Sequence, residues 1–280
     1  PNRTETANIT ISDGKITYGI FGGGQGYSYT GTANLTISDG DMSNSYVTAG
    51  GSNGYTSSAN VKLTGGKIGV YQTVNRGTLN TAIVKVAGAS IGKFYIGGET
   101  EDKSVTGIIN KINTYLVSGN IETLDSGTSN GSPITLDDEA YNVTATNSVK
   151  ITNDNIGDSK KSISYDFTVS TKTVKLFVNQ NMKMPIVVTT NPTGYEDIFV
   201  DLFSYSVDDE SIATVSADGV ITGVSEGNTS VTVKNGEKVE TIDVTVTDVQ
   251  HLIVLLSVIA TLVLILLTVL FAFLYLKFFE

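Results

Sequence analysis

Two neighbouring stretches of this chain, TANITISDG at Thr6–Gly14 and TANLTISDG at Thr32–Gly40, differ at a single position. They open two longer copies of one pattern, in which two short alternating segments are separated by glycine-rich turns. The copies that follow one another are Thr6–Gly31, Thr32–Ser58, Ala59–Thr81, Ala82–Gly107 and, in degraded form, Ile108–Gly131. One copy carries too little apolar surface to fold alone, so the copies have to stack.

Stacking predicts which apolar residues lie above one another. We expect two ladders, Ile9–Leu35–Val61–Val84 and Ile11–Ile37–Leu63–Val86, with every backbone N–H and C=O paired to the next coil. The fold class is therefore all-β, with a β-solenoid that resembles a right-handed parallel β-helix over residues 1–131. Residues 132–172 keep an alternating pattern and are expected to form the solenoid end and linker strands. The alternative is a propeller or a sandwich built from hairpins.

The repeats also carry phrases such as ISDGKITYGIFGGG (Ile11–Gly24), LTGGKIGVYQ (Leu63–Gln72) and KFYIGGE (Lys93–Glu99). In these phrases they resemble the glycine-rich β-helical repeats of large secreted and surface proteins of gut bacteria and archaea. The resemblance implies a surface protein. Calcium is not implied, because the repeats lack a regular Gly-Gly-x-Gly-x-Asp pattern.

A second pattern begins after the repeats. Its phrases are Tyr205–Asp208, Ser211–Val215 (SIATV), Asp218–Gly223 (DGVITG), Gly227–Val233 and Thr241–Val246. They resemble the bacterial immunoglobulin-like domain, group 2, which implies a β-sandwich over residues 173–248. Tyr205 stands where that family usually has Trp, and the insert YEDIFVDLF at Tyr195–Phe203 departs from its pattern.

Within that sandwich, Asp218-Gly219 predicts a two-residue hairpin turn between two short strands.

An uncharged apolar run extends from Leu252 to Leu276, followed by Lys277. As a helix it exceeds the ~30 Å hydrocarbon core of a bilayer, so residues 249–280 are predicted to be a single-pass membrane anchor with a short tail. Lys277 favours a cytoplasmic tail and an extracellular N-terminal region. No wall-sorting signal precedes the run, and it has no Gly-x-x-x-Gly face. The alternative is a buried core helix.

Composition excludes several classes of function. The chain has no Cys, one His and a net charge of −10, so disulfides, thiolate metal sites and nucleic-acid binding are not expected. The one imidazole, His251, adjoins the membrane run, which rules out a His-based triad in this chain. We expect no cofactor. Acidic loops at Asp137–Glu139 and at Asp154 and Asp158 leave a hard-cation site open, although solvated turns explain them better.

Two further sets of residues are candidate sites. Asp13 and Asp39 hold equivalent places and would stack at a spacing that suits glycoside cleavage, but Asp before Gly is a common turn residue, so no catalytic residue is expected. Tyr29 and Tyr55 also hold equivalent places, and Tyr27 lies beside the first. These three tyrosines would make a platform for sugar rings or a partner protein, or alternatively cover the core.

These patterns together predict a non-catalytic, membrane-anchored, adhesin-like surface protein. The solenoid would bind a glycan or a protein of a host or neighbouring cell, the immunoglobulin-like domain would serve as a stalk, and membrane lipid would hold the helix. The alternatives are a phage or virus structural protein, and an envelope-bound polysaccharide lyase or hydrolase.

Overall fold

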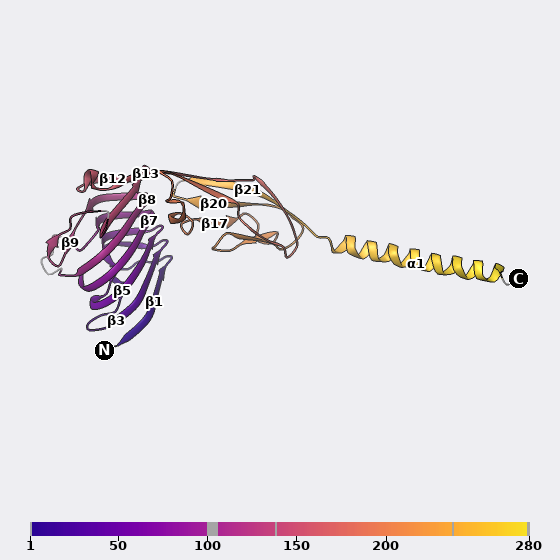
Figure 1. Cartoon of the computed structure of the whole chain (residues 1–280), viewed down its shortest axis with the longest axis horizontal. Coiled ribbons are helices and arrows are strands. Elements are labelled where there is room, and N and C mark those ends of the chain that lie inside the picture. Colours follow the sequence, from indigo (N-terminus) through magenta and orange to yellow (C-terminus); the bar gives the residue numbers. More distant parts are fainter. Residues whose placement is uncertain (1, 100–105, 138, 237, 279–280) are drawn as a thin grey trace. The chain divides into compact units, whose positions relative to one another are not determined.

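The computed structural model describes residues 2–99, 106–137, 139–236 and 238–278. The first part of the chain winds into a stack of about six coils, as the expected solenoid does (Figure 1). Its strands are β1 (Arg3–Ile11), β2 (Ile20–Phe21), β3 (Tyr29–Ile37), β4 (Asp41–Thr48), β5 (Ser52–Leu63), β6 (Lys67–Gln72), β7 (Arg76–Tyr95), β8 (Ile108–Asp125), β9 (Thr128–Ser129), β10 (Ser132–Pro133), β11 (Tyr141–Thr146), β12 (Val149–Asp154) and β13 (Lys161–Val169).

Neighbouring coils pair as parallel strands, in the order β1-β3-β5-β7-β8-β11-β13. The predicted ladders are confirmed: Ile9, Leu35, Val61 and Val84 are successive partners, and so are Ile11, Ile37, Leu63 and Val86. Leu35, Val61 and Val84 are at most 1% exposed. Inward Ile, Leu and Val alternate with outward Thr, Asn and Lys, and this alternation gives the stack its core.

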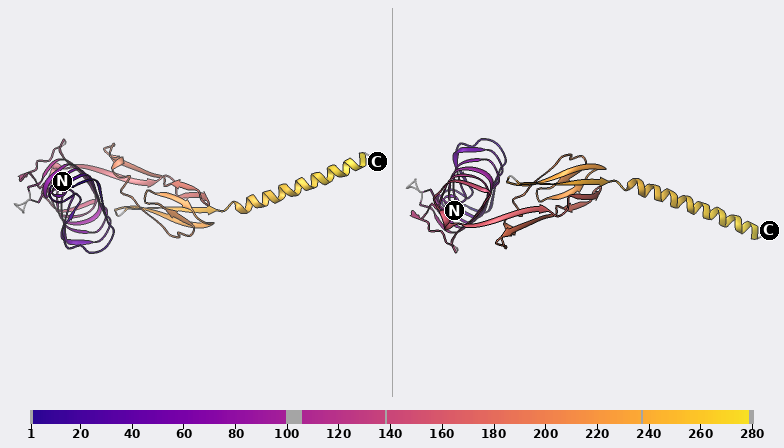
Figure 2. Two further views of the ribbon diagram at one scale, coloured as in Figure 1. Left: turned by 90° about the horizontal axis from the view of Figure 1, so that it is seen from below. Right: turned by 90° about the horizontal axis from the view of Figure 1, so that it is seen from above.

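The coils also form a second row of paired strands. In this row β2 pairs with β4, β4 pairs with β6, and β6 pairs with β7. The two rows fuse in β7, whose first half pairs with β5 and whose last residues pair with β6. β8 pairs with both halves of β7 in the same way. Figure 2 shows these coils from two further sides.

The fifth coil starts later than its sequence copy suggests. Ala82 pairs with Ile112 and not with Ile108, which pairs with Thr78. Turn glycines set the corners of the earlier coils, where Gly14, Gly40 and Gly66 have φ of 99°, 110° and 78°. These angles favour a residue without Cβ.

Past the repeats, the middle segment forms strands as expected from its alternation. β11 pairs with β8 and β13, and β12 lies on the second half of β8. A short 3₁₀ turn, η1 (Gly157–Ser159), precedes β13. Residues 134–136, which also alternate, are not a strand. The predicted bounds 1–131, 132–172, 173–248 and 249–280 stay a prediction.

The second half of the chain forms two small sheets, with strand orders β14-β21-β20-β17 and β15-β19-β18, while β16 joins the solenoid sheet beside β13. The core between these sheets includes Ile221, Val231 and Val233, none of which is exposed. The elements are β14 (Thr173–Phe177), β15 (Asn181–Lys183), β16 (Ile186–Asn191), η2 (Glu196–Ile198), β17 (Ser204–Val207), β18 (Ala213–Val215), β19 (Val220–Gly223), β20 (Gly227–Asn235), β21 (Lys238–Thr247) and α1 (Gln250–Phe278).

The β18–β19 hairpin differs in detail from the two-residue turn expected at Asp218-Gly219. Ser216 N donates to Val220 O, and Gly219 N donates to Ser216 O. Three residues, 217–219, therefore make the loop, with Gly219 at φ 79°, as in the three-residue hairpins that place glycine last. Tyr205 packs over this glycine, since a Cβ there would lie 2.6 Å from the Tyr205 Cζ.

The chain divides into two compact units. The first contains residues 1–168 together with the segments 187–203 and 234–239, and the second contains residues 169–186, 204–233 and 240–280. The insert Tyr195–Phe203 therefore belongs to the same unit as the solenoid.

Candidate functional site

The two tyrosines predicted to share a column do so. Tyr29 on β3 pairs with Tyr55 on β5, and their rings stack with centroids 5.5 Å apart and planes 13° apart. On the β1 side, the guanidinium carbon of Arg3 lies 5.0 Å from the centroid of the Tyr29 ring. Both faces of the Tyr29 ring are therefore occupied by protein, which leaves its edge and hydroxyl for a ligand. Arg3 is held there by its ion pair with Glu5, at 2.8 Å.

Tyr27 lies apart from this stack, in the turn before β3, and is 97% exposed. Among the residues that the structure describes, no ring–ring contact includes it. Of the three predicted binding tyrosines, the structure thus brings two together and leaves the third free in solvent. Their role in binding stays a prediction.

A second aromatic group lies on the other strand position of the same coils. The rings of Phe21 and Tyr46 meet edge to face, with centroids 5.6 Å apart, and Tyr46 is 40% exposed. Tyr18, beside Gly19, is 84% exposed. We call Tyr18, Phe21 and Tyr46 the aromatic patch.

Sequence comparison of the repeats missed this patch because the residues do not hold equivalent places. Lys15 bridges to Asp41, but Ile20 pairs with Val47. The second coil therefore has one more residue between Asp41 and Val47 than the first coil has between Lys15 and Ile20. This shift sets Gly19, and not Ile20, beside Tyr46. The available clue was the number of tyrosines in the first two copies.

Exposed tyrosine is concentrated in the first coils. In the described part of the chain before Ser132, the exposed large apolar side chains are Tyr18, Tyr27, Tyr46, Tyr55 and Ile83. The next tyrosines, Tyr71 and Tyr95, are 0% and 3% exposed, and Tyr71 stacks on Phe94 in the core at 4.6 Å. Burial accordingly raises the pKa of Tyr71 far above its ordinary value. Tyrosine is thus a surface residue in the first two copies of the repeat and a core residue in the next two.

Rows of amides and hydroxyls run beside the Tyr29–Tyr55 stack. Asn34 Nδ2 donates to Asn8 Oδ1 at 2.8 Å, and Asn60 Nδ2 donates to Asn34 Oδ1 at 2.9 Å. Ser58 Oγ donates to the hydroxyl of Thr32 at 3.1 Å. These ladders fix the outward side chains in a regular array without net charge.

The insert Tyr195–Phe203 contacts the outward-facing column of side chains that contains Lys62 and Lys85. Lys62 and Lys85 follow Thr36 in that column, and both pair with Asp201, at 2.6 and 2.7 Å. Lys85 Nζ also donates to Ile198 O at 2.9 Å. Burial opposes ionisation of Asp201, but the hydrogen bonds from the two lysines outweigh it and lower the pKa of its carboxyl group.

Beside these ion pairs, Phe199 fills an apolar pocket of the first unit. It is 0% exposed and stacks on Tyr165 at 4.2 Å. Ala87 and Val117, from β7 and β8, belong to the same cluster. The sequence marked this insert as unusual but held no sign of its partners.

The carboxylates considered as catalytic groups are engaged by their own turns. Asp13 Oδ1 accepts the Gly14 N–H at 2.6 Å, and Asp39 Oδ1 accepts the Gly40 N–H at 2.7 Å. In the acidic loop, the N–H groups of Glu139, Ala140 and Tyr141 all donate to Asp137, which lowers the pKa of its carboxyl. Asp138 lies outside the described residues.

Among the described residues, no group of three or more His, Cys, Asp or Glu is arranged to hold a metal ion. The side chain of His251 lies outside that part of the chain.

The C-terminal helix α1 contains an apolar stretch, Val254–Tyr275, with a mean hydropathy of 3.0. It is long and apolar enough to cross a membrane, and none of it is buried in protein. The predicted anchor residues Leu252, Leu276 and Lys277 fall within the helical backbone, although the side chains of the two leucines are outside the described part.

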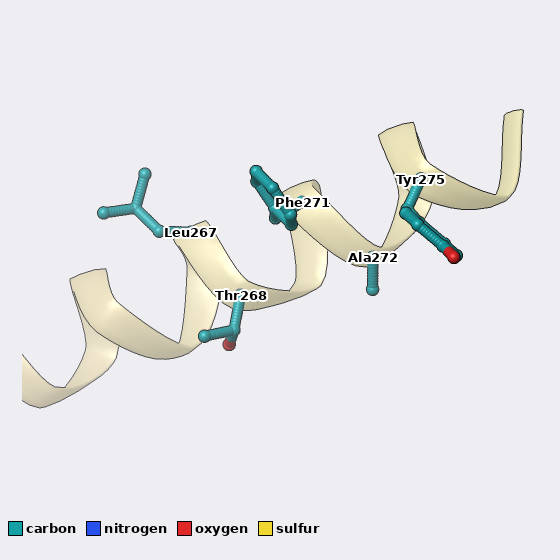
Figure 3. A pocket seen from close by; sticks show the side chains of 5 residues that line it. All are labelled: Leu267, Thr268, Phe271, Ala272 and Tyr275. Atoms are coloured by element: carbon teal, nitrogen blue, oxygen red, sulfur yellow. The ribbon is translucent and has the colours of Figure 1, made fainter. Parts of the chain in front are cut away.

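Figure 3 shows a groove on this helix, lined by Leu267, Thr268, Phe271, Ala272 and Tyr275. Because one helix supplies the whole lining, the groove is an open gap between side chains of that helix. The Thr268 hydroxyl is satisfied within the helix, donating to Ile265 O at 2.7 Å.

Comparison with known proteins agrees with the second pattern in the sequence. The family model described as bacterial Ig-like domain (group 2) matches residues 166–246. No curated protein matches the chain. The two small sheets, the glycine-closed hairpin and the family match together identify residues 166–246 as a bacterial immunoglobulin-like domain of group 2, carried between a β-solenoid and an apolar helix.

Proposed function

We propose that this chain is a non-catalytic, adhesin-like protein of the cell surface. In this proposal α1 crosses the cell membrane once, the N-terminal region lies outside the cell, and the solenoid binds a glycan or a protein of another surface. The immunoglobulin-like domain serves as the spacer that separates binding from anchoring.

The observation that supports binding by the solenoid is the placement of its tyrosines. Tyr18, Tyr27, Tyr46 and Tyr55 are 84%, 97%, 40% and 39% exposed, and all four belong to the first coils. Tyrosine offers a rigid apolar ring and a hydroxyl in one side chain, so it is favoured where a protein surface contacts a partner. A catalytic function has less support, because the equivalent carboxylates Asp13 and Asp39 accept hydrogen bonds from the backbone of their own turns.

The test uses the full chain inserted in fluorescent liposomes and applied to glycan arrays and to intact cells. We expect retention on a defined set of glycans or cells, with liposomes lacking protein as the control. The same incubations are assayed for newly formed reducing ends and unsaturated sugars. Cleavage of a sugar would contradict the non-catalytic proposal and indicate an enzyme. Failure to bind any glycan or cell would contradict the adhesin proposal.

A further inference from the structure

The aromatic patch of Tyr18, Phe21 and Tyr46 lies on a different strand position from the Tyr29–Tyr55 stack. It is drawn from the first two coils, since Phe21 is on β2 and Tyr46 is on β4, its parallel neighbour. The surrounding strand is held by core residues: Met42 and Val47 are 0% exposed, and Ser45 Oγ donates to Ile16 O of the preceding coil at 2.5 Å. These contacts hold the strand beside Tyr46, although its pairing with β6 shifts register between Met42 and Tyr46.

Gly19 provides the space for this arrangement. A Cβ at position 19 would overlap the Tyr46 ring, at its Cε2 and Cζ atoms. The Tyr46 ring therefore lies over bare backbone of the neighbouring coil, while 40% of the residue remains exposed. Tyr29 differs, because its ring is enclosed between Arg3 and Tyr55.

The residues that follow Tyr46 in the same column of the later coils are not aromatic. Its successive partners are Val70, Lys93 and Thr123. The strand position itself therefore does not require an aromatic residue, and within this column the ring belongs to the second coil alone.

The polar residues near the patch indicate the kind of ligand. Ser43 and Asn44 are exposed and uncharged. Asp41 lies between Lys15 and Lys67 on the adjacent strands, so the nearest charges alternate in sign. Hydrogen bonds from the Ser43 hydroxyl and amide lower the pKa of the Asp41 carboxyl, which favours the carboxylate form of Asp41. A strongly charged ligand gains little from such a row.

We propose that the aromatic patch is a binding site for a neutral polysaccharide, with hexose rings stacking on Tyr18 and Tyr46 and hydroxyls meeting Ser43 and Asn44. Adjacent coils are about 4.8 Å apart, a spacing comparable to one hexose unit of an extended chain, so successive sugars meet successive coils. This inference rests on the proposed function, because it names the ligand class and the place of contact for the adhesin.

The test measures binding of the full chain in nanodiscs to soluble dextran, laminarin, mannan and cello-oligosaccharides, with alginate and heparin as acidic probes. We expect at least one neutral probe to bind, and the Y18A/Y46A variant to weaken that binding roughly tenfold or more. Ile83→Ser is the matched control, because Ile83 is 41% exposed and lies outside the patch. Thermal melting of each variant checks the fold.

The outcomes separate the inference from the proposed function. Binding to cells or to acidic probes, without binding to any neutral probe, overturns the neutral-sugar inference and leaves the adhesin standing. Neutral-probe binding that survives Y18A/Y46A but is lost in Y27A/Y55A moves the site to the other tyrosines. If the chain binds no probe and no cell, both proposals fail.

Discussion

The carboxylate of Asp201 lies 2.7 Å from the ammonium group of Lys85, although the two residues are 116 positions apart in the sequence. The insert that carries Asp201 is thereby bound to the solenoid strand that carries Lys85. Lys85 is only 13% exposed, so loss of its partner leaves a largely desolvated charge.

Replacing Asp201 by Asn is expected to lower the unfolding free energy of the first compact unit by about 1–2 kcal/mol at pH 7, reduced by the solvent that reaches the carboxylate. The pKa of Asp201 is lowered in the folded protein from its ordinary value of 3.8. Its contribution to stability is therefore complete above that ordinary value and is lost as the pH falls through the folded pKa.

The measurement is hydrogen exchange of the slowest amides of β5 and β7 at pH 7, with chemical unfolding of the same protein at neutral pH and in strong acid, below the folded pKa. The difference between wild type and Asp201→Asn should vanish at the acidic end. Asp197→Asn, at an exposed position of the same insert, is the control. An equal loss in both variants would show that the lysines are not the cause.

Phe199→Ala is expected to cost about 3–5 kcal/mol, because the ring is fully buried and its removal leaves a cavity beside Tyr165. For a unit of this size, the melting midpoint should fall by roughly 6–20 °C. The adjacent Val200 is 59% exposed, so Val200→Ala should have almost no effect. Similar melting of the two variants would contradict the packing of Phe199 on Tyr165.

Two turn glycines form a matched pair. Gly14 and Gly66 both have positive φ, at 99° and 78°, but a Cβ on Gly14 meets no atom within 4 Å, whereas one on Gly66 lies 3.0 Å from Gly40 O. Gly14→Ala should cost about 1–2 kcal/mol of conformational strain. Gly66→Ala should cost more, about 2–4 kcal/mol, because backbone must also move. Urea unfolding of both variants measures the difference, and equal costs would refute the close approach of the coils.

The full chain should remain with membranes after alkaline carbonate washing, because Val254–Tyr275 has no charged residue and a mean hydropathy of 3.0. Replacing Leu264 and Leu267 together by Arg should cost about 5–7 kcal/mol of insertion free energy and release a large share of the protein. The L264A/L267A variant keeps an uncharged helix and should stay bound. Wild-type protein in the wash would exclude a transmembrane anchor.

The local and repeated features of this fold follow from sequence. The Ile9 and Ile11 ladders and the Tyr29–Tyr55 pairing were predictable because identical phrases recur and parallel coils keep register. The apolar helix was predictable from composition alone. In both cases the pattern is visible in the sequence itself, as a recurring phrase or as an uninterrupted apolar run.

The aromatic patch and the partners of the insert were not predictable in this way. A single extra residue between Asp41 and Val47 changes which residue faces Tyr46, and pattern matching of degenerate repeats does not locate such a shift. The contact of Phe199 with Tyr165 joins distant segments, and amino-acid type alone does not say which buried ring meets which.

The amide ladder of Asn8, Asn34 and Asn60 recurs at an interval of 26 residues. Because these coils present the same groups above and below, an in-frame genetic duplication of one interval would offer the new coil ready-made neighbours on both sides. Recombination between the repeats would thus lengthen this part of the gene in steps that repeat contacts already present between its coils.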